Sequence, residues 1–438
     1  MAGESRKSST AKSSTSNGVE RSEYPNGLVL ATERMEHLRS VSLGVWMKMG
    51  SRHEPAEENG VSHFIEHLLF KGTETKSARD IALIIDSVGG QMDAFTTKEY
   101  TCFYFKVLDR HLDVAIDLLT DIIRHPKFEP DEIEKERKVI YEEIKMVDDT
   151  ADELVYDVWS EAHYGHHPLG RPIQGTMESV GRMRPEMLTR FFRDSYKPAN
   201  LMVTAAGNVD HPRLAGAIGD AFAGLEPGRM QPLGPAPAGR TEATVIVRDK
   251  KELGQLHLCL GLPGVKMDDE RRFPLYVLNT LLGGAMSSRL FQHVREERGL
   301  AYSVYSSANS FLDVGNLLVY AATSPESGDE VTELVQVELR RLKSEAVSAA
   351  ELQHSKDHLK GSLMLSLESS SSRMSNLARQ EIYFGRHFSL DEILRGIDTV
   401  ESAHLTALAR DLFDPSRSTF AVLGNVGGTR LDKVRLEF

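Results

Sequence analysis

Two histidines and a glutamate in residues 63–67, His-Phe-Ile-Glu-His, have the spacing of a metal-dependent hydrolase. On a helix each residue turns by about 100°, so His63 and His67 lie one turn apart on the same face. Both imidazoles can then reach one metal ion at about 2.0–2.1 Å. Glu66 projects about 60° to one side, where its carboxylate can act on a bound water without being a ligand. The pattern H-x-x-E-H therefore predicts a zinc site that carries its own base.

The segment around this motif has the pattern of an amphipathic helix, because its apolar residues recur at helical spacing: Val61, Phe64, Ile65, Leu68 and Leu69. Two histidines beside such an apolar stripe can also be ordinary core residues. With 16 His among 438 residues, a five-residue match can moreover arise by chance. A third ligand is needed to separate these alternatives, because zinc in a catalytic site takes three protein ligands and keeps a fourth position for water.

A second helix, opened by Pro130, supplies candidates for that third ligand. Glu136 and Glu143 are seven residues apart and therefore lie within about 20° of each other on one face. A helix this rich in charge is usually a solvated surface. The apolar residues Val139 and Ile140 between the two glutamates indicate that part of the helix is nevertheless buried.

Further stretches follow the motif in a characteristic order, at residues 70–73, 89–96, 167–176, 288–291 and 295–302. Together with H-x-x-E-H, and with Glu143 placed 76 residues after His67, they resemble the pitrilysin or insulinase family of zinc peptidases. Within that family the chain is most similar to the mitochondrial-processing-peptidase-like subfamily. The resemblance runs from about residue 24 to about residue 428.

The resemblance implies one zinc ion per chain, held by His63, His67 and Glu143, with Glu66 as general base. It also implies that Glu136 supports the site from outside the ligand shell. Two neutral imidazoles and one carboxylate leave the metal positively charged, which lowers the pKa of a bound water toward about 7. Glu66 can then accept the proton of that water and later deliver it to the leaving amine.

Two further catalytic residues are implied in the second half of the chain, Arg295 and Tyr302. A guanidinium and a phenol near the scissile carbonyl stabilise the negative charge that develops on its oxygen. Without the resemblance, residues 295–298 would be interpreted as an exposed helix end with pairs of opposite charge. If both residues act at the zinc, catalysis needs both halves of the chain, and residues 1–230 alone should be inactive.

The stretch after Gly89-Gly90 is interpreted as an edge strand that binds an extended peptide through main-chain hydrogen bonds. The expected substrate-binding residues are Gly90, Asp93, Ala94, Phe95 and Thr96. Family members commonly carry Asn where this chain has Asp93. An ionised Asp cannot donate a hydrogen bond, so Asp93 is expected to attract a basic substrate residue instead.

The rest of the pattern predicts a mixed fold, with strands at 40–49, 100–107, 256–262 and 316–321 and helices at 112–124, 273–282 and 329–343. A Gly-Asn-Val triplet at 207–209 recurs at 424–426 and indicates an internal duplication. We therefore predict an α+β protein of two similar domains, each an antiparallel sheet with helices packed on it. The resemblance implies that these domains form a clamshell chamber.

Four segments are expected along the chain. Residues 1–22 are rich in Ser, Thr, Lys and Gly and are expected to be a disordered tail. Residues 23–225 form the zinc-binding catalytic domain, and residues 226–241 form a Pro/Gly-rich linker. Residues 242–438 form the domain that contributes Arg295 and Tyr302.

Composition limits the possible partners. The formal charge of −12 and the absence of an apolar run of membrane length predict no nucleic-acid and no membrane partner. Cys102 and Cys259 lie in predicted strands and are expected to be buried free thiols, in keeping with a reducing compartment. The N-terminus lacks a secretory or mitochondrial pattern, so a cytoplasmic location is expected. The histidines at 163, 166 and 167 are expected to lie in a Gly/Pro-containing loop rather than in a second metal site.

Two classes of function fit these observations. The first is a zinc endopeptidase that acts on short or unfolded polypeptides, and the second is a non-catalytic scaffold subunit of a larger complex. The presence of His63, Glu66, His67 and Glu143 together favours the peptidase. Relatives that enclose the chamber within one chain are longer than this one, so a homodimer is expected.

Overall fold

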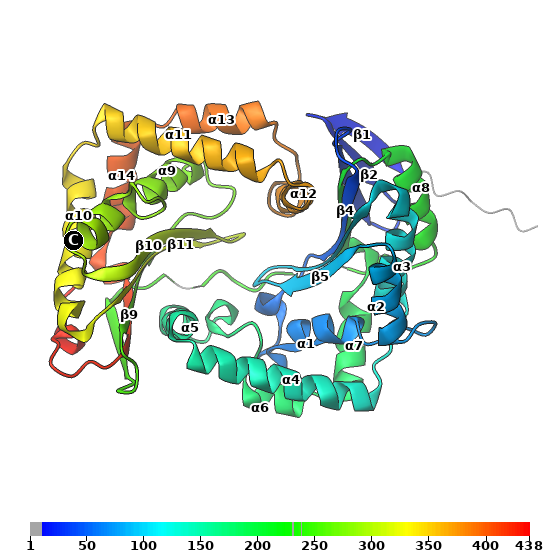
Figure 1. Cartoon of the computed structure of the whole chain (residues 1–438), viewed down its shortest axis with the longest axis horizontal. Helices are drawn as coiled ribbons and strands as arrows, with labels where there is room; N and C mark the ends of the chain where they lie inside the picture. Colours follow the sequence, from blue (N-terminus) through cyan, green and yellow to red (C-terminus); the bar gives the residue numbers. More distant parts are fainter. Residues whose placement is uncertain (1–10, 230–231, 238) are drawn as a thin grey trace, which may run out of the picture. The chain divides into compact units, whose positions relative to one another are not determined.

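The computed structural model describes residues 11–229, 232–237 and 239–438, which divide into two compact units (Figure 1). Unit 1 comprises the chain up to Ile144, Pro172–Gly234 and Ser366–Ser389. Unit 2 comprises Lys145–Arg171, Pro235–Leu365 and Leu390–Phe438. Neither unit is one continuous stretch, so both differ from the domains 23–225 and 242–438 expected from the sequence.

Unit 1 is built on a sheet with the strand order β1-β2-β3-β7-β4-β6-β5. Only the pairing of β3 with β7 is parallel among the described pairs of this sheet. The strands are β1 (Lys12–Ser16), β2 (Val19–Glu23), β3 (Val29–Arg34), β4 (Ser40–Met47), β5 (Gln91–Thr96), β6 (Thr101–Leu108) and β7 (Leu201–Gly207).

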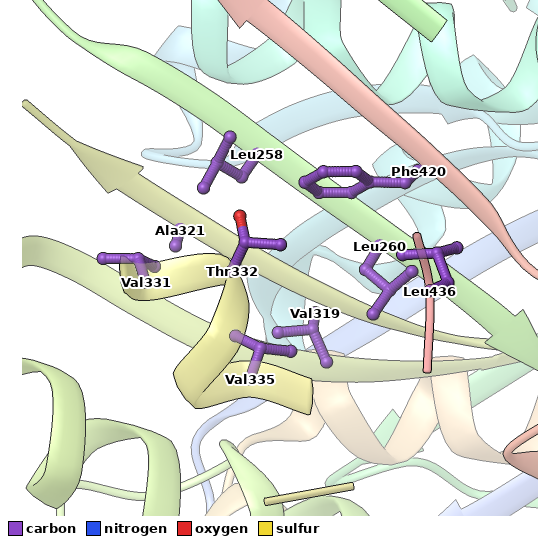
Figure 2. Close-up of a pocket in the computed structure, with 9 residues that line it drawn as sticks. All are labelled: Leu258, Leu260, Val319, Ala321, Val331, Thr332, Val335, Phe420 and Leu436. Atoms are coloured by element: carbon purple, nitrogen blue, oxygen red, sulfur yellow. The ribbon is translucent and has the colours of Figure 1, made fainter. Parts of the chain in front are cut away.

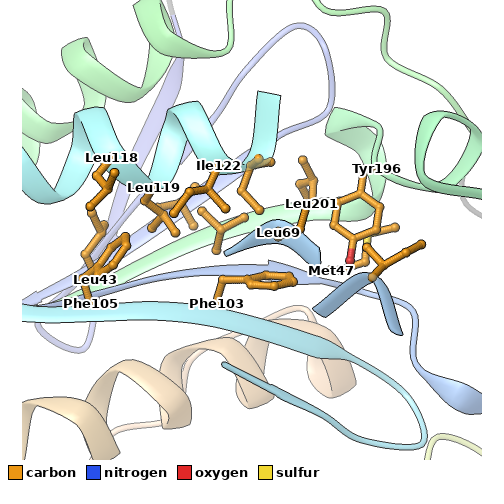
Figure 3. Close-up of a cluster of buried hydrophobic side chains, with 14 of the residues drawn as sticks. Leu43, Met47, Leu69, Phe103, Phe105, Leu118, Leu119, Ile122, Tyr196 and Leu201 are labelled. Carbon is orange, nitrogen blue, oxygen red and sulfur yellow. The ribbon is translucent and has the colours of Figure 1, made fainter. Parts of the chain in front are cut away.

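The helices of unit 1 are α1 (Val61–Leu69), α2 (Ala78–Ser87), α3 (Leu112–Arg124), α4 (Pro130–Asp149, with its last residues in unit 2), α6 (Met177–Arg182), α7 (Pro185–Ser195), α8 (His211–Ala221) and α12 (Ser370–Phe384). Apolar residues at helical spacing on α3 face the sheet, and Figure 3 shows Leu118, Leu119 and Ile122 pointing toward Leu43 and Phe105. This core fixes the sheet on which α1 packs, through β5 and β6.

Unit 2 is built on a sheet with the order β10-β11-β9-β12-β8. Its strands are β8 (Thr244–Asp249), β9 (Leu256–Pro263), β10 (Ala301–Ser310), β11 (Gly315–Thr323) and β12 (Thr419–Gly424). Its helices are α5 (Ala151–Tyr164), α9 (Arg272–Leu282), the π-helix Phe291–Glu296, α10 (Gly328–Ser344), α11 (Ala349–Ser366), α13 (Leu390–Asp398) and α14 (Ser402–Leu412).

A small hollow lies within the core of unit 2, between α10 and the sheet (Figure 2). Its volume is about 10 Å³, and Thr332 is the one polar side chain among the residues that line it. A space of this size holds no more than about one water molecule. It is a packing defect of the core rather than a place for a substrate.

The two sheets confirm the internal duplication. The order β3-β7-β4-β6-β5 in unit 1 is repeated as β8-β12-β9-β11-β10 in unit 2, with one parallel pair at the same place. Gly207 and Gly424 of the two Gly-Asn-Val triplets have φ of 129° and 132°. A Cβ there would lie 2.2 Å from Ser40 O and 2.4 Å from Gln255 O, respectively. Both triplets therefore serve the same close turn at the end of equivalent strands.

Each sheet is covered on one face by a helix from the other half of the sequence. Helix α5 packs on β8, β9 and β12 of unit 2, and α12 packs on the equivalent strands β3, β4 and β7 of unit 1. This exchange explains why the units are discontinuous. The periodicity of a helix shows that it has an apolar face, but not which sheet that face covers.

The prediction of a disordered tail is wrong for residues 12–22, because they form the hairpin β1–β2. Asn17 and Gly18 have φ of 54° and 80°, the left-handed conformation that an Asn-Gly hairpin turn requires. The buried Val19 packs in the same cluster as Trp46, and Arg21 Nη2 lies 2.9 Å from Glu381 Oε1 of α12. Residues 1–10 of the expected tail lie outside the described residues.

Three further predictions concern the linker, the two cysteines and helices that could cross a membrane. The described part of residues 226–241 contains no helix or strand, as expected of a Pro/Gly-rich linker. Cys102 and Cys259 are buried free thiols, as predicted. Among the helices of the described residues, none has the length and apolar character needed to cross a membrane.

Candidate metal centre

Helix α1 is held at its first turn by a buried carboxylate. Gly60 N and Ser62 N donate to the two oxygens of Glu54 at 2.7 and 2.8 Å, and Glu54 is only 3% exposed. A negative charge at this end of a helix satisfies free N–H groups and interacts favourably with the helix dipole. Glu54 was not predicted from the sequence, because its distance from the helix start matches no local capping pattern.

The structure brings the three predicted metal ligands together. The rings of His63 and His67 have centroids 4.7 Å apart. Glu143 Oε2, on α4, lies 3.7 Å from His63 Nε2 and 3.6 Å from His67 Nε2. One ligand atom from each residue lies within 4.8 Å of the others. These separations exceed hydrogen-bond lengths and are close to the roughly 3.4 Å between the ligands of a tetrahedral zinc ion.

The imidazole of His67 is oriented by a carboxylate behind it. His67 Nδ1 lies 3.1 Å from Glu136 Oε2, and Lys71 Nζ lies 2.8 Å from Glu136 Oε1. Donation from Nδ1 to this buried carboxylate leaves the lone pair of Nε2 facing Glu143. Lys71 was not predicted as a site residue, although it lies in the matching stretch 70–73. Glu136 thus has a direct physical means of supporting the site.

His63 can supply a second neutral imidazole to the metal. Burial and the neighbouring His67 lower the pKa of His63 to about 4, so its ring is neutral near pH 7. Its Nδ1 is buried and has no hydrogen-bond partner among the described residues. A donor set of two neutral imidazoles and one carboxylate suits zinc, so the residues present fit the metal that the sequence predicts.

The side chain of Glu66 extends from α1 toward the sheet. There Thr96 Oγ1, at the end of β5, donates to Glu66 Oε2 at 2.5 Å. Burial raises the pKa of Glu66, and the hydrogen bond from Thr96 opposes that rise. A carboxylate with a raised pKa accepts a proton more readily near neutral pH. Thr96 was expected to contact substrate, whereas its hydroxyl is already engaged with the predicted base.

The strand β5 lies at the edge of its sheet, as expected, and pairs with β6 on one side. Two of its expected substrate contacts have structural roles: Phe95 packs on Trp46 at 5.8 Å between ring centroids, and a Cβ at Gly90 would lie 2.5 Å from Ile85 Cδ1. Asp93 is exposed and accepts from Tyr104 Oη at 3.2 Å. This edge therefore presents main-chain groups without a strand partner and the exposed Asp93 carboxylate.

Arg295 and Tyr302 lie in unit 2 and contact each other. Arg295 is in the π-helix, with its guanidinium carbon 5.1 Å from the ring centroid of Tyr302. Tyr302 sits at a β-bulge near the start of β10 and is 79% exposed. The bulge turns the Tyr302 side chain away from the sheet, so this phenol is exposed beside the half-buried Arg295.

Fold and site together define a class of protein: two duplicated α+β units, one of which carries a three-ligand metal centre on an H-x-x-E-H helix. Residues 29–177 match the family description "Insulinase (Peptidase family M16)", and residues 182–359 match "Peptidase M16 inactive domain". The chain belongs to this insulinase family of peptidases, M16. The resemblance stated from the sequence is thereby confirmed.

Named relatives agree over most of the chain. A Bacillus subtilis protein named uncharacterized zinc protease YmxG is 44% identical over 396 residues, which span 90% of this chain and 96% of that protein. An uncharacterized zinc protease of Streptomyces coelicolor is 40% identical over 422 residues, 94% of this chain and 92% of that protein.

Solved structures confirm the fold. A protease from Helicobacter pylori superimposes with a TM-score of 0.87 at 23% identity, covering 92% of this chain and 99% of that one. A structure from Pseudomonas fluorescens, titled as a peptidase M16 inactive domain, superimposes with a TM-score of 0.88 at 20% identity, covering 94% and 99%. The two-unit α+β architecture is therefore shared across distant sequences.

Proposed function

We propose that this protein is a zinc-dependent endopeptidase that hydrolyses peptide bonds in short or unfolded polypeptides. The observation that carries the proposal is the convergence of one ligand atom each from His63, His67 and Glu143 within 4.8 Å, with Glu66 one helical position away from His67. The names of the relatives in B. subtilis and S. coelicolor, both called zinc proteases, support it.

Each residue of the site then has one role. A zinc ion supplies Lewis-acid polarisation of the scissile carbonyl and activation of water. His63, His67 and Glu143 hold the metal, and Glu136 keeps His67 in the tautomer that presents Nε2. Glu66 accepts a proton from the water that attacks the scissile carbonyl carbon. It returns that proton to the nitrogen that leaves when the C–N bond breaks.

We further propose that the substrate binds as an added strand along β5. An edge strand offers unpaired main-chain groups to an extended segment, which excludes substrates that cannot unfold. Asp93, exposed on this strand, would favour a basic residue close to the cleaved bond. Arg295 and Tyr302 would stabilise the oxyanion, which makes catalysis depend on both halves of the chain. The homodimer and the cytoplasmic location stay predictions from the sequence.

A scaffold role is the second candidate, because the description matched by residues 182–359 is that of an inactive domain. That match covers the second half of the chain, whereas all of the metal ligands lie in the first match, residues 29–177. A complete ligand set beside a half-buried, hydrogen-bonded Glu66 supports catalysis in the first half.

The test compares the wild type with Glu66→Gln for zinc content and for cleavage of a mixed peptide library. We expect Glu66→Gln to retain zinc while cleavage falls by about 10³-fold, as for loss of a general base. Glu57→Gln, a change at an exposed glutamate close to the same helix, is the matched control and should cleave like the wild type. A zinc-loaded wild type that cleaves nothing would support the scaffold role. Equal rates for the wild type and Glu66→Gln would remove Glu66 as the base.

A further inference from the structure

The turn after β5 is tied to the segment that precedes α1. Ser51 N donates to Thr97 O at 3.1 Å, and Arg52 N donates to Lys98 O at 2.8 Å. A Cβ at Gly50 would lie 2.2 Å from Thr97 O, so the two backbones are in direct contact. A shift of this turn therefore requires a shift of the 50–52 segment as well.

A buried ion pair locks the same junction. Arg52 Nη1 lies 2.8 Å from Glu99 Oε1, and the two side chains are 2% and 4% exposed. Breaking such a pair is costly, because the remaining partner becomes an uncompensated buried charge. Two residues after Arg52, Glu54 caps α1, and three residues before Glu99, Thr96 donates to Glu66. Glu54, which caps the helix that carries Glu66, and Thr96, which donates to Glu66, are therefore both adjacent to the Arg52–Glu99 pair.

A helix from the second half of the sequence reaches this junction. Burial, the charge of the neighbouring Glu99 carboxylate and a hydrogen bond to it raise the pKa of Tyr383, which lies near the end of α12. The Tyr383 ring also meets the Tyr100 ring edge to face, with centroids 6.5 Å apart. Glu99 therefore has a partner from the loop before α1 and another from α12.

We propose that Tyr383 is a positioning residue for Glu66, which it reaches through Glu99 and the 97–100 turn. The inference rests on the proposed peptidase function, since it assigns a second support to the base of that reaction. Fixing Glu99 fixes the turn, and the turn places the Thr96 hydroxyl against the Glu66 carboxylate. Misplacement of a reacting group by about 1 Å can lower a rate by about 10²-fold. The base in unit 1 is thus aligned by a helix that enters the unit from the distant end of the sequence.

The docking of α12 does not depend on the Tyr383 hydroxyl. Arg21 Nη2 pairs with Glu381 at 2.9 Å, Ser370 Oγ lies 2.9 Å from Ser42 Oγ, and the Met374 carbonyl accepts from Thr204. Removing one hydroxyl at Tyr383 should therefore leave the helix in place and loosen only the junction.

The experiment uses the full chain with Tyr383→Phe. The matched control is Tyr24→Phe, which removes a hydroxyl that donates to Ala215 O at 2.7 Å elsewhere in unit 1. We expect Tyr383→Phe to keep its zinc and its KM, to lose about 10-fold in kcat, and to exchange amide hydrogens faster in residues 96–100. Tyr24→Phe should change none of these quantities.

A double-mutant cycle with Thr96→Val separates positioning from general destabilisation. If Tyr383 acts through Thr96, the double variant should be no slower than Thr96→Val alone, because the shared interaction is already lost. Additive losses in kcat would overturn the inference, as would exchange and kcat of Tyr383→Phe that match those of Tyr24→Phe. If the wild type cleaves no peptide, the proposed function fails, and the exchange of residues 96–100 alone then decides whether Tyr383 holds the turn.

Discussion

Five strands follow the same order in both units, but the large side chain between sheet and covering helix comes from the sheet in one unit and from the helix in the other. Trp46 on β4 pairs with Met202, and Gly261 at the equivalent position on β9 pairs with Thr419. In unit 1 the sheet supplies the large side chain, whereas in unit 2 the helix does, because Trp159 of α5 fills the space above Gly261. These are the only two tryptophans of the chain.

This difference explains why each of the two exchanged helices, α5 and α12, packs on only one of two similar sheets. Trp159 on the first sheet would meet Trp46, and the smaller residues of α12 on the second sheet would leave a void above Gly261. Overpacking and cavities each cost about 1–5 kcal/mol, so each sheet selects its own helix.

A second difference concerns chemistry. Between β4 and β5, unit 1 carries α1 with His63, Glu66 and His67. Between β9 and β10, unit 2 carries α9, whose sequence Arg-Phe-Pro-Leu-Tyr-Val-Leu-Asn-Thr-Leu-Leu has no His, Glu, Asp or Cys. The duplication therefore preserved the scaffold while metal-binding residues occupy one copy of this helix.

The largest effect is expected from separating the halves of the sequence. Residues 1–230 alone lack α12, so the sheet face around Trp46 and Met202 is uncovered, and their α5 has no sheet to cover. We expect this fragment to lack cooperative thermal unfolding and stable zinc binding. Circular dichroism and metal analysis test this, with a peptide of residues 366–389 added to restore both. Cooperative unfolding of zinc-loaded 1–230 without the peptide would contradict the assignment of α12 to unit 1.

Next in size is the loss of one metal ligand. His67→Ala should lose bound zinc and about 10³-fold in peptide cleavage, because two ligands no longer fix the metal geometry. His166→Ala, at an exposed histidine of unit 2, should keep both. Metal analysis after dialysis against a weak chelator measures the difference. Zinc loss from His166→Ala would show that the metal is not restricted to unit 1.

The inverted packing is tested by two glycines. Gly261→Ala places a Cβ 2.1 Å from the Trp159 ring and should lower the free energy of unfolding of unit 2 by about 3 kcal/mol. At Gly44→Ala the Cβ would lie 3.0 Å from both Met374 Sδ and Trp46 Nε1, a much looser contact than at Gly261, so the cost should stay near about 1 kcal/mol. Denaturant unfolding measures both. Equal costs, or no recovery on adding Trp159→Leu to Gly261→Ala, would argue against the inverted packing.

A smaller, pH-dependent effect is expected where α12 docks on unit 1. Burial opposes ionisation of Glu381, but the His387 imidazole, whose Nε2 lies 3.2 Å from Glu381 Oε2, and the hydrogen-bonded Arg21 guanidinium prevail and lower its pKa from 4.5 to about 2. A lowered pKa stabilises the fold above about pH 4.5, and that stability is lost as the pH falls toward 2. Glu381→Gln should therefore cost about 2 kcal/mol at pH 7 and much less at pH 3. Urea unfolding at both pH values checks this, and a cost that does not change with pH would contradict it.

The smallest effect concerns the edge strands. Asp93 on β5 should favour peptides with Lys over peptides with Ala near the cleaved bond by about fivefold in kcat/KM, a preference that Asp93→Asn should remove. Salt should weaken the preference of the wild type, since exposed charges are screened. Unchanged relative rates in Asp93→Asn would exclude this role.

Local elements and the residues of the candidate site could be predicted from the amino-acid sequence. Helix α3 begins and ends at Leu112 and Arg124 as its apolar periodicity predicts. The H-x-x-E-H spacing placed His63 and His67 on one face, and the family resemblance added Glu143 to the ligand set that the structure brings together. Asn17-Gly18 is typical of a hairpin turn, but the polar composition around it led to the wrong prediction of a disordered tail. Spacing along a helix fixes relative direction, so such features need no knowledge of the rest of the chain.

Tertiary structure alone decided what supports the site and which helix covers which sheet. Glu54, Lys71 and the Thr96 hydroxyl act through contacts that no local spacing encodes. Likewise, α5 and α12 both have faces that bury apolar residues, and only the shape of each sheet, with Trp46 in one and Gly261 in the other, determines where each belongs. Complementary packing depends on residues far apart in sequence, which is why periodicity could predict the helices but not their exchange.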